Sequence, residues 1–293
     1  MRAVRTYPVD LDLVKLDEVD STNDELRRIL QNRPPSSSCS TLKAVLALRQ
    51  TQGRGRLGRR WESPPGGLYF SLALEVPDAS ERVAALSLIV ALAIRKELAQ
   101  LAELLAKQGQ TEPQDILVKW PNDLICPQGK LAGILIELVR LAPDELVPDE
   151  LAPDELAPKQ QYALVGVGIN LARPNAGASE KAAYLSDFCS ETPDREQTVK
   201  QIIESIVAYY AEWKAADCAF AHWVDEYNAK LSLIGREATA SNGEGEVLAE
   251  GCVQGVNNSG SLLLLGEKGI LTEVDTGEVT LRQSLSHFAP IDT

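Results

Sequence analysis

The spacing of apolar residues divides the chain into a longer part of strands and helices and a shorter part of strands alone. After an extended start, runs of aliphatic and β-branched residues predict strands at 44–50, 68–76, 116–120, 124–126, 131–139 and 161–171. Apolar residues at helical spacing predict helices at 83–107, 196–214 and 220–231. A further helix is predicted to begin directly after Asp20-Ser21-Thr22-Asn23, because Thr22 and Glu25 have the spacing of a capping box.

Beyond Gly235 the pattern changes to short apolar runs separated by glycine and asparagine turns. These runs predict strands at 236–241, 246–256, 261–265, 270–274 and 278–282, an arrangement that is typical of a small β-barrel. We therefore predict an α/β (α+β) protein of two domains. The larger, mixed domain would cover residues 1–232 and the C-terminal β domain residues 233–293.

A low-complexity segment, residues 140–160, interrupts the mixed part between its last two strands. The pattern Leu-Ala-Pro-Asp-Glu starts at Leu141 and again at Leu151, and Leu-Val-Pro-Asp-Glu starts between them at Leu146. Regularly repeated proline prevents both helix formation and strand pairing. We predict a solvated acidic insert without chemistry, and the alternative is an element that docks another protein.

Composition and charge exclude several classes of function. The 293 residues carry a formal net charge of −13 and a pI near 4.8, which disfavours nucleic-acid binding through bulk charge. The 5 cysteines are widely spaced and there are 2 histidines, so neither a disulfide framework nor a zinc site is indicated. No export signal is visible, and the longest apolar stretch, 83–94, is too short to span a bilayer. These features predict a cytoplasmic protein with no membrane contact and no dedicated metal site.

One arginine-rich loop contrasts with this acidity. In Gly53-Arg54-Gly55-Arg56-Leu57-Gly58-Arg59-Arg60-Trp61, 4 arginines fall within 9 residues. Glycines let the backbone approach a ligand closely, and guanidinium groups match the oxygens of phosphate or carboxylate. No Gly-Lys-Ser/Thr follows, so the loop is not a P-loop. We expect it to bind a small anion, although composition alone also allows RNA binding or a solvated loop.

Seven short motifs, in a fixed order along the chain, carry a resemblance to a known family. Three of them look like motifs of the biotin-protein ligases: Gln50 with the arginine-rich loop and Glu62-Ser63-Pro64-Pro65-Gly66-Gly67-Leu68-Tyr69, then Lys119-Trp120-Pro121-Asn122-Asp123, then Gly129-Lys130-Leu131-Ala132-Gly133-Ile134-Leu135-Ile136-Glu137. The others are Asp20-Ser21-Thr22-Asn23, Gly166-Val167-Gly168-Ile169-Asn170, Gly260-Ser261-Leu262-Leu263-Leu264 and Gly277-Glu278-Val279-Thr280-Leu281-Arg282. Each motif is weak alone, but the ordered set is highly specific.

The resemblance implies a class II synthetase-like ligase core, a mixed sheet with helices on one side, followed by a small SH3-like β-barrel. It also implies an ATP-dependent enzyme: biotin and ATP give biotinyl-5'-AMP and pyrophosphate, and a lysine of a biotin carboxyl carrier protein, an acetyl-CoA carboxylase subunit, then takes the biotinyl group. ATP and biotin would be substrates, and Mg²⁺ would accompany ATP. Members that repress transcription carry a helix-turn-helix domain before Asp-Ser-Thr-Asn. Residues 1–19 leave no room for one, so we expect an enzyme that does not bind nucleic acid.

The resemblance assigns roles to particular residues. Lys130 and Arg56 would be catalytic, because they would place positive charge beside the biotin carboxylate and the α-phosphate. The loop would close over the intermediate and exclude water. Biotin would contact Ser21, Thr22, Asn23, Gln50, Arg54, Gly55, Arg56 and Lys130. The nucleotide would contact Arg54, Arg56, Arg59, Trp61, Lys119, Asn122, Asp123, Lys130 and Asn170.

Other interpretations stay open for the whole chain and for single residues. A lipoate-protein ligase would use the same adenylation with a different acid, and an RNA-binding module would use the arginine-rich loop without catalysis. Lys130 could be a solvated lysine at a hairpin tip, and Thr22 could be a helix cap. The Trp120 ring could form a wall for biotin or adenine, or it could be a core side chain. The intact loop together with the motif from Lys119 to Asp123 favours biotin over lipoate.

Overall fold

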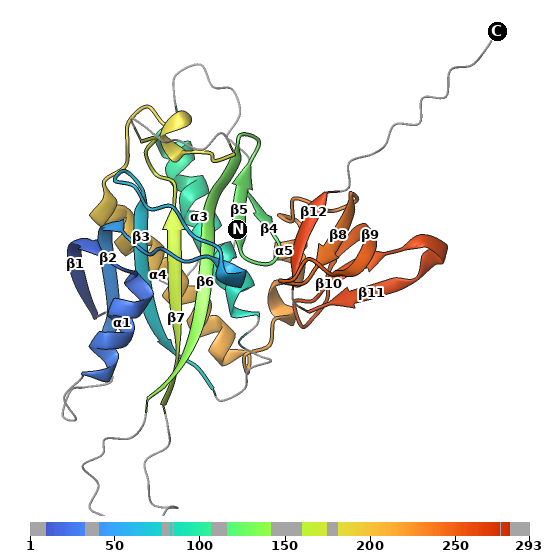
Figure 1. Ribbon diagram of the computed structural model, residues 1–293, viewed down its shortest axis with the longest axis horizontal. Coiled ribbons are helices and arrows are strands. Elements are labelled where there is room, and N and C mark those ends of the chain that lie inside the picture. The colour runs from blue at the N-terminus through green and yellow to red at the C-terminus, as the bar shows by residue number, and fades with distance from the viewer. Residues whose placement is uncertain are drawn as a thin grey trace, which may run out of the picture.

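The larger part of the chain forms a seven-stranded mixed sheet (Figure 1). The computed structural model describes residues 10–32, 41–77, 83, 85–106, 116–141, 160–174, 181–275 and 277–281. The strands are β1 (Leu11–Val19), β2 (Leu42–Gln50), β3 (Leu68–Glu75), β4 (Leu117–Lys119), β5 (Asp123–Cys126), β6 (Gly129–Leu141) and β7 (Gln160–Ile169). Their order is β1-β2-β3-β7-β6-β5-β4, and only the β1–β2 pair among them is parallel. The mixed sheet predicted from the sequence is confirmed.

Helices cover both faces of this sheet. The helices are α1 (Thr22–Gln31), α3 (Leu86–Leu104), α4 (Arg195–Ala215) and the short α5 (Val224–Asn228). Helix α1 packs against Val45, Ala73 and Leu164, whereas the residues next to these in sequence point to the opposite face, where α3 and α4 lie. The expectation of helices on one side is therefore wrong, because the strand alternation leaves apolar residues on both faces for helices to bury.

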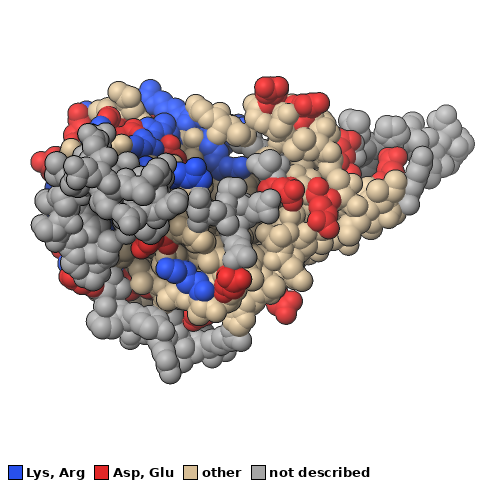
Figure 2. Space-filling model, turned by 90° about the horizontal axis from the view of Figure 1, so that it is seen from below, with Lys and Arg blue, Asp and Glu red and all other residues tan. Residues whose placement is uncertain are grey.

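The C-terminal part forms a separate five-stranded antiparallel sheet. Its strands are β8 (Glu237–Ser241), β9 (Val247–Val256), β10 (Leu262–Leu265), β11 (Leu271–Val274) and β12 (Glu278–Leu281), in the order β11-β10-β9-β8-β12. Within the described residues no ladder joins the edge strands β11 and β12. In Figure 2, acidic side chains are spread over the end of the molecule that this sheet forms, whereas Lys and Arg on that face gather over the larger sheet.

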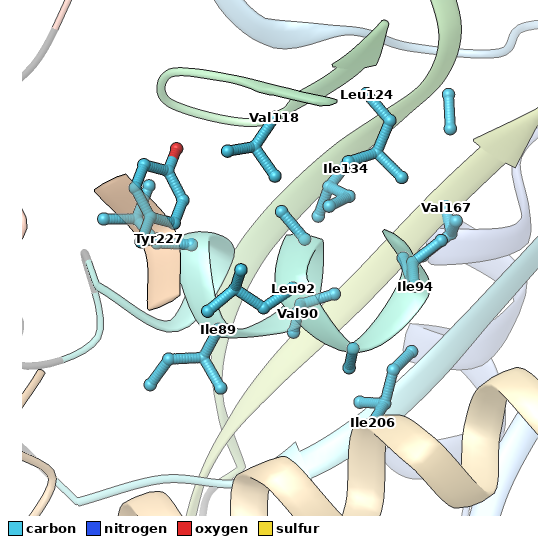
Figure 3. Close-up of a cluster of buried hydrophobic side chains, with 14 of the residues drawn as sticks. Ile89, Val90, Leu92, Ile94, Val118, Leu124, Ile134, Val167, Ile206 and Tyr227 are labelled. Atoms are coloured by element: carbon cyan, nitrogen blue, oxygen red, sulfur yellow. The ribbon is translucent and has the colours of Figure 1, made fainter. Parts of the chain in front are cut away.

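One apolar core connects α3, α4 and both sheets. Ile89, Val90, Leu92 and Ile94 of α3 pack against strand residues such as Val118 and against Ile206 of α4 (Figure 3). The buried residues of the C-terminal sheet, among them Ala238, Val253 and Leu262, belong to the same cluster. Each fully buried aliphatic side chain stabilises the fold by about 1.5–3 kcal/mol relative to an exposed one.

Several boundaries differ from the sequence prediction. The predicted capping box is absent: helix α1 starts at Thr22 with Ser21 as its N-cap, and Ser21 makes no side-chain cap hydrogen bond. The helix predicted at 220–231 is shorter: a 3-10 turn at Ala221–Trp223 precedes α5, and beyond α5 Leu231 forms a bridge with Val118 of β4. Helix α3 begins and ends inside the range 83–107.

The acidic insert predicted at 140–160 lies outside the described residues except for its ends. Leu141 of β6 pairs with Gln160 of β7, so its two ends are neighbours in the sheet. Arg282, the last residue of the motif that begins at Gly277, also lies outside the described residues. None of the helices that the structure describes combines the length and the apolar character that crossing a membrane requires.

Candidate active site

A pocket of about 760 Å³, open to solvent, lies on the α1 face of the large sheet. It is bounded by the start of α1, the end of β2, the arginine-rich loop 53–61, the turn between β4 and β5, and strands β6 and β7. All eight residues predicted to contact biotin line it: Ser21, Thr22, Asn23, Gln50, Arg54, Gly55, Arg56 and Lys130. The structure thus brings together segments that are far apart in the sequence.

Three glycines form the floor of this first pocket. Gly133 of β6 pairs with Gly168 of β7, and Gly166 lies two residues earlier on the same face. A Cβ on Gly168 would lie 2.5 Å from the Trp61 indole, and one on Gly166 would lie 2.6 Å from Asn23 Oδ1. These distances are too short for any side chain other than hydrogen, so the glycines are required for the close approach of the loop and of α1 to the sheet.

A chain of buried hydrogen bonds orients the polar end of the pocket. The Thr22 backbone N–H and Oγ1 both donate to Gln50 Oε1, at 2.8 and 3.0 Å. Gln50 Nε2 donates to Ser63 Oγ at 3.0 Å. The hydroxyl of Ser71, which is fully buried on β3, lies 2.8 Å from Thr22 Oγ1 and 2.6 Å from Asn23 Oδ1. Because a buried polar group needs partners, this chain fixes where the remaining donors and acceptors point.

The charge of Arg54 is balanced by two carboxylates. Its guanidinium forms ion pairs with Asp24 of α1 and with Glu137 of β6, the latter at 2.9 Å, and Asn23 Nδ2 donates to the same Glu137 oxygen at 2.7 Å. The hydrogen bond from Arg54 lowers the pKa of Asp24, and the one to Asp24 raises the pKa of Arg54 above its usual range. Arg54 therefore ties the loop to α1 and β6.

Lys130 and Arg56 lie next to the turn between β4 and β5. Lys130 Nζ is 2.8 Å from Asp123 Oδ1 and 5.0 Å from the centre of the Trp61 ring. The contact with Asp123 is an ion pair without hydrogen-bond geometry, since this buried oxygen has no hydrogen-bond partner among the described residues. Arg56 Nη1 donates to Gly277 O of the C-terminal sheet at 3.2 Å and lies 3.4 Å from Asn122 Oδ1.

A second pocket, of about 810 Å³, adjoins the first. Its lining includes Asn170 and Tyr184, and it shares Arg60, Trp61 and Lys130 with the first pocket. The Asn170 amide donates to Lys130 O at 3.0 Å, so the end of β7 is fixed to the lysine backbone. Trp61 and Lys130 therefore stand between the two pockets.

Two predicted contacts are not brought to these pockets. Lys119 lines neither of them. Trp120 is 2 % exposed and its indole N–H donates to Gly260 O at 3.0 Å, so it is a core side chain. The other predicted nucleotide contacts line one pocket or both: Arg54, Arg56, Arg59, Trp61, Asn122, Asp123, Lys130 and Asn170.

Sequence reasoning missed other residues that shape the pockets. They are Asp24, Ser71, Glu137, Tyr184 and the floor glycines. For Ser71 and Glu137 a signal was available, because each is a polar residue on a predicted strand and stands between two apolar residues. Their alternation places them on the same face of the sheet as Gly166 and Gly168.

Comparisons with known proteins show which family the chain resembles. Residues 16–146 match the Biotin/lipoate A/B protein ligase family. The chain is 30% identical over 257 residues to the biotin--[acetyl-CoA-carboxylase] ligase of Paracoccus denitrificans, covering 87% of this chain and 94% of that one. It is 27% identical to the bifunctional ligase/repressor BirA of Escherichia coli over 92% of this chain and 74% of that one. The structure of a biotin protein ligase from Aquifex aeolicus in complex with biotin and ATP superposes with a TM-score of 0.68 at 28% identity, covering 93% and 99% of the two chains.

Proposed function

The chain belongs to the biotin protein ligase family, and we propose that its two adjoining pockets join biotin to ATP and pass the biotinyl group to a lysine of an acceptor protein. One observation carries this proposal: Trp61 and Lys130 line both pockets. A carboxylate held in one pocket and an α-phosphate held in the other would therefore meet at the same ammonium group.

The first pocket suits biotin. Its buried end presents hydroxyl and amide groups of Thr22, Asn23 and Gln50, which match the carbonyl and N–H groups of a ureido ring. The Trp61 indole and the Asn23 amide lie directly over the floor glycines, so a flat bicyclic ligand would pack against these two groups. A lipoyl group has an apolar dithiolane ring in place of the ureido ring and could not exchange hydrogen bonds with these polar groups. This favours biotin over lipoate.

The second pocket suits the adenosine of ATP. Trp61 and Tyr184 supply aromatic surface, and Asn170 supplies a polar edge. Asn170 is held in place by its hydrogen bond to the backbone of Lys130. The nucleotide would thus be positioned by the same strand ends that position the catalytic lysine.

In the first step a biotin carboxylate oxygen attacks the α-phosphorus and pyrophosphate leaves. Both reactants are anions, so the barrier falls when fixed positive charge offsets their repulsion. Lys130 supplies this charge between the pockets, and Asp123 orients its ammonium group. Arg56 lies at the loop side of the pocket, held by Asn122 and by the backbone of Gly277.

Mg²⁺ is expected with ATP. Within the described part of the chain, no group of three or more His, Cys, Asp or Glu side chains could hold a metal ion. Asp123 is the carboxylate that lines the first pocket, and its buried Oδ1 is already paired with the Lys130 ammonium group. We therefore expect the ion to enter on the phosphates, where it would neutralise charge, without a dedicated carboxylate ligand from the described residues.

In the second step the acceptor lysine, as a free amine, attacks the carbonyl carbon of biotinyl-5'-AMP and AMP leaves. A mixed anhydride is hydrolysed by water, so the arginine-rich loop has to cover it until the lysine arrives. The expected acceptor is a biotin carboxyl carrier domain, since the Paracoccus relative is named for acetyl-CoA carboxylase. Arg54 holds the loop to the core through Asp24 and Glu137.

Biotin-dependent exchange between ATP and labelled pyrophosphate tests the first step without an acceptor. We expect exchange with biotin and none with lipoate. Lys130→Ala should lower the exchange rate about 10³-fold, whereas Lys200→Ala, on the surface of α4, should not change it. Exchange with lipoate alone, or full exchange by Lys130→Ala, would contradict the proposal.

A further inference from the structure

The arginine-rich loop contacts the C-terminal sheet at two points. The Leu57 side chain lies over Gly243, where an added Cβ would be 3.0 Å from Leu57 Cδ2. Arg56 donates to Gly277 O at 3.2 Å, at the start of β12. The rim of the first pocket is thus built by both parts of the molecule.

The turn between β8 and β9 has a fixed shape at this rim. Asn242 Oδ1 accepts hydrogen bonds from the backbone N–H groups of Glu244 and Glu246, at 3.0 and 2.9 Å. Asn242 Nδ2 also donates to the Glu246 carboxylate at 3.0 Å. The two carboxylates therefore sit on an ordered turn beside the loop.

Exposed apolar side chains surround this turn. Leu57 is 46% exposed, Val247 55% and Leu248 44%. Leu248 lies beside Gly277, since a Cβ on Gly277 would be 3.3 Å from Leu248 Cδ1. Gly277 is also the residue that Arg56, the neighbour of Leu57 in the chain, contacts. Three aliphatic side chains exposed beside an active site form a surface that a partner protein can bury. We call Leu57, Glu244, Glu246, Val247 and Leu248 the rim face.

The charge of the rim face is opposite to that of the pocket. Arginines and Lys130 line the pocket and would repel the ammonium form of an arriving lysine. The C-terminal part, residues 233–293, has 9 acidic residues against 3 basic ones, and Glu244 and Glu246 are its acidic groups at the rim. They offset that repulsion where a lysine would pass.

We propose that the rim face is the docking surface for the lysine-bearing segment of the acceptor domain. Apolar side chains beside the acceptor lysine would pack on Leu57, Val247 and Leu248, while Glu244 and Glu246 would attract the lysine. This inference rests on the proposed function, because it concerns only the second step. The two can be tested apart, since pyrophosphate exchange needs no acceptor.

The apolar half is tested with Val247→Asp in the full-length enzyme. We expect unchanged biotin-dependent pyrophosphate exchange and a KM for a purified biotin carboxyl carrier domain raised about tenfold. Leu271→Asp is the matched control, because Leu271 is 51% exposed on the edge strand β11 of the same sheet; its KM should not change. Equal KM values for the two variants would overturn the docking surface, whereas loss of exchange in the wild type would overturn the proposed function.

The charged half is tested with Glu244→Lys against Glu267→Lys, which makes the same change of charge in the turn between β10 and β11. Glu244→Lys should lower kcat/KM for the carrier domain several-fold at low salt, and the difference should shrink as salt is raised. Equal effects of both variants would show a general charge effect and overturn the steering role. If Val247→Asp changes the oligomeric state measured by light scattering and leaves the carrier KM unchanged, the face binds a second copy of this chain.

Discussion

The two faces of the seven-stranded sheet are made by alternate residues of the same strands and serve opposite purposes. On β7, Ala163, Val165 and Ile169 face α3 and α4 in the apolar core, whereas Gly166 and Gly168 face the first pocket. The α3 face is filled by aliphatic side chains (Figure 3). On the α1 face, side chains are removed or made polar where the ligand is expected. The α3 face therefore stabilises the fold along its length, whereas the α1 face is apolar beneath helix α1 and is polar or lined by glycine at the pocket.

The strongest test of this comparison is Leu92→Ala on the α3 face. Leu92 is 1% exposed in the apolar core, so truncation should leave a cavity and lower the free energy of unfolding by about 2–5 kcal/mol. Pyrophosphate exchange at 25 °C should keep its rate per folded molecule. Urea unfolding and the exchange assay measure the two effects, and a fall in exchange rate similar to that of a pocket variant would contradict the division between faces.

On the α1 face, Gly168→Val should have the opposite result to Leu92→Ala: a large loss of activity with biotin. The added side chain would occupy the position of the Trp61 ring, only 2.5 Å from its Cβ. Overpacking of this kind costs about 1–3 kcal/mol, which we expect to appear as a roughly 10²-fold loss in kcat/KM for biotin. Val165→Ala, fully buried on the opposite face of the same strand, is the control and should lose stability but not activity. Normal biotin kinetics in Gly168→Val would show that a side chain fits at this position and would contradict the requirement for glycine.

Two buried serines allow a finer version of the same comparison. Ser71 contacts Thr22 and Asn23 beneath the pocket, whereas Ser205 of α4 donates to Ala93 O at 3.3 Å on the other face. Loss of one hydrogen bond costs about 0.5–1.5 kcal/mol. Ser71→Ala should therefore raise the KM for biotin about fivefold with kcat unchanged at saturation, and Ser205→Ala should change stability alone. Equal effects of Ser71→Ala and Ser205→Ala on the KM for biotin would contradict a positioning role of Ser71.

The sequence predicted the strands and the pocket residues well for a physical reason. Long apolar runs such as 161–171 have few alternatives to a buried strand, and the residues predicted to contact biotin, which line the first pocket, cluster in motifs that occur in a fixed order. The side of the sheet on which each helix packs was not predictable from single motifs. Val45 is as apolar as Leu46, and only the assembled sheet shows that α1 covers one and the core covers the other.

The polar contacts of the site were also beyond the sequence. Thr22 has the spacing of a helix cap, yet its hydroxyl donates to Gln50, which is distant in sequence. The sequence around Arg54 gives no indication of an ion-pair partner, but the fold places the carboxylates of Asp24 and Glu137 beside its guanidinium group. Such pairings depend on which strands become neighbours, and local patterns carry no information about long-range partners. For the same reason the sequence left the position of Trp120 open, and the hydrogen bond from its indole N–H to Gly260 O places it in the core.

The last and smallest expected effect concerns acid. Because Arg54 lowers the pKa of Asp24, this carboxylate stabilises the folded state above its unfolded pKa, near 3.9, and the contribution is lost as the pH falls through the folded pKa. Asp20, whose pKa is lowered to about 2 by its hydrogen bond with Arg28, acts in the same direction at the start of α1. Both groups belong to the α1 side, so acid should weaken the ligand-binding region first.

Asp24→Asn isolates this contribution. Asp24 is partly solvated, so screening limits its stabilisation at pH 7 to at most about 1 kcal/mol. Thermal unfolding should therefore show the variant slightly less stable than the wild type at pH 7. The two curves should converge as the pH falls below about 4, because a protonated Asp24 pairs with Arg54 no better than asparagine does. A gap that stays constant down to pH 2.5 would mean that the effect comes from packing of the side chain and not from its charge.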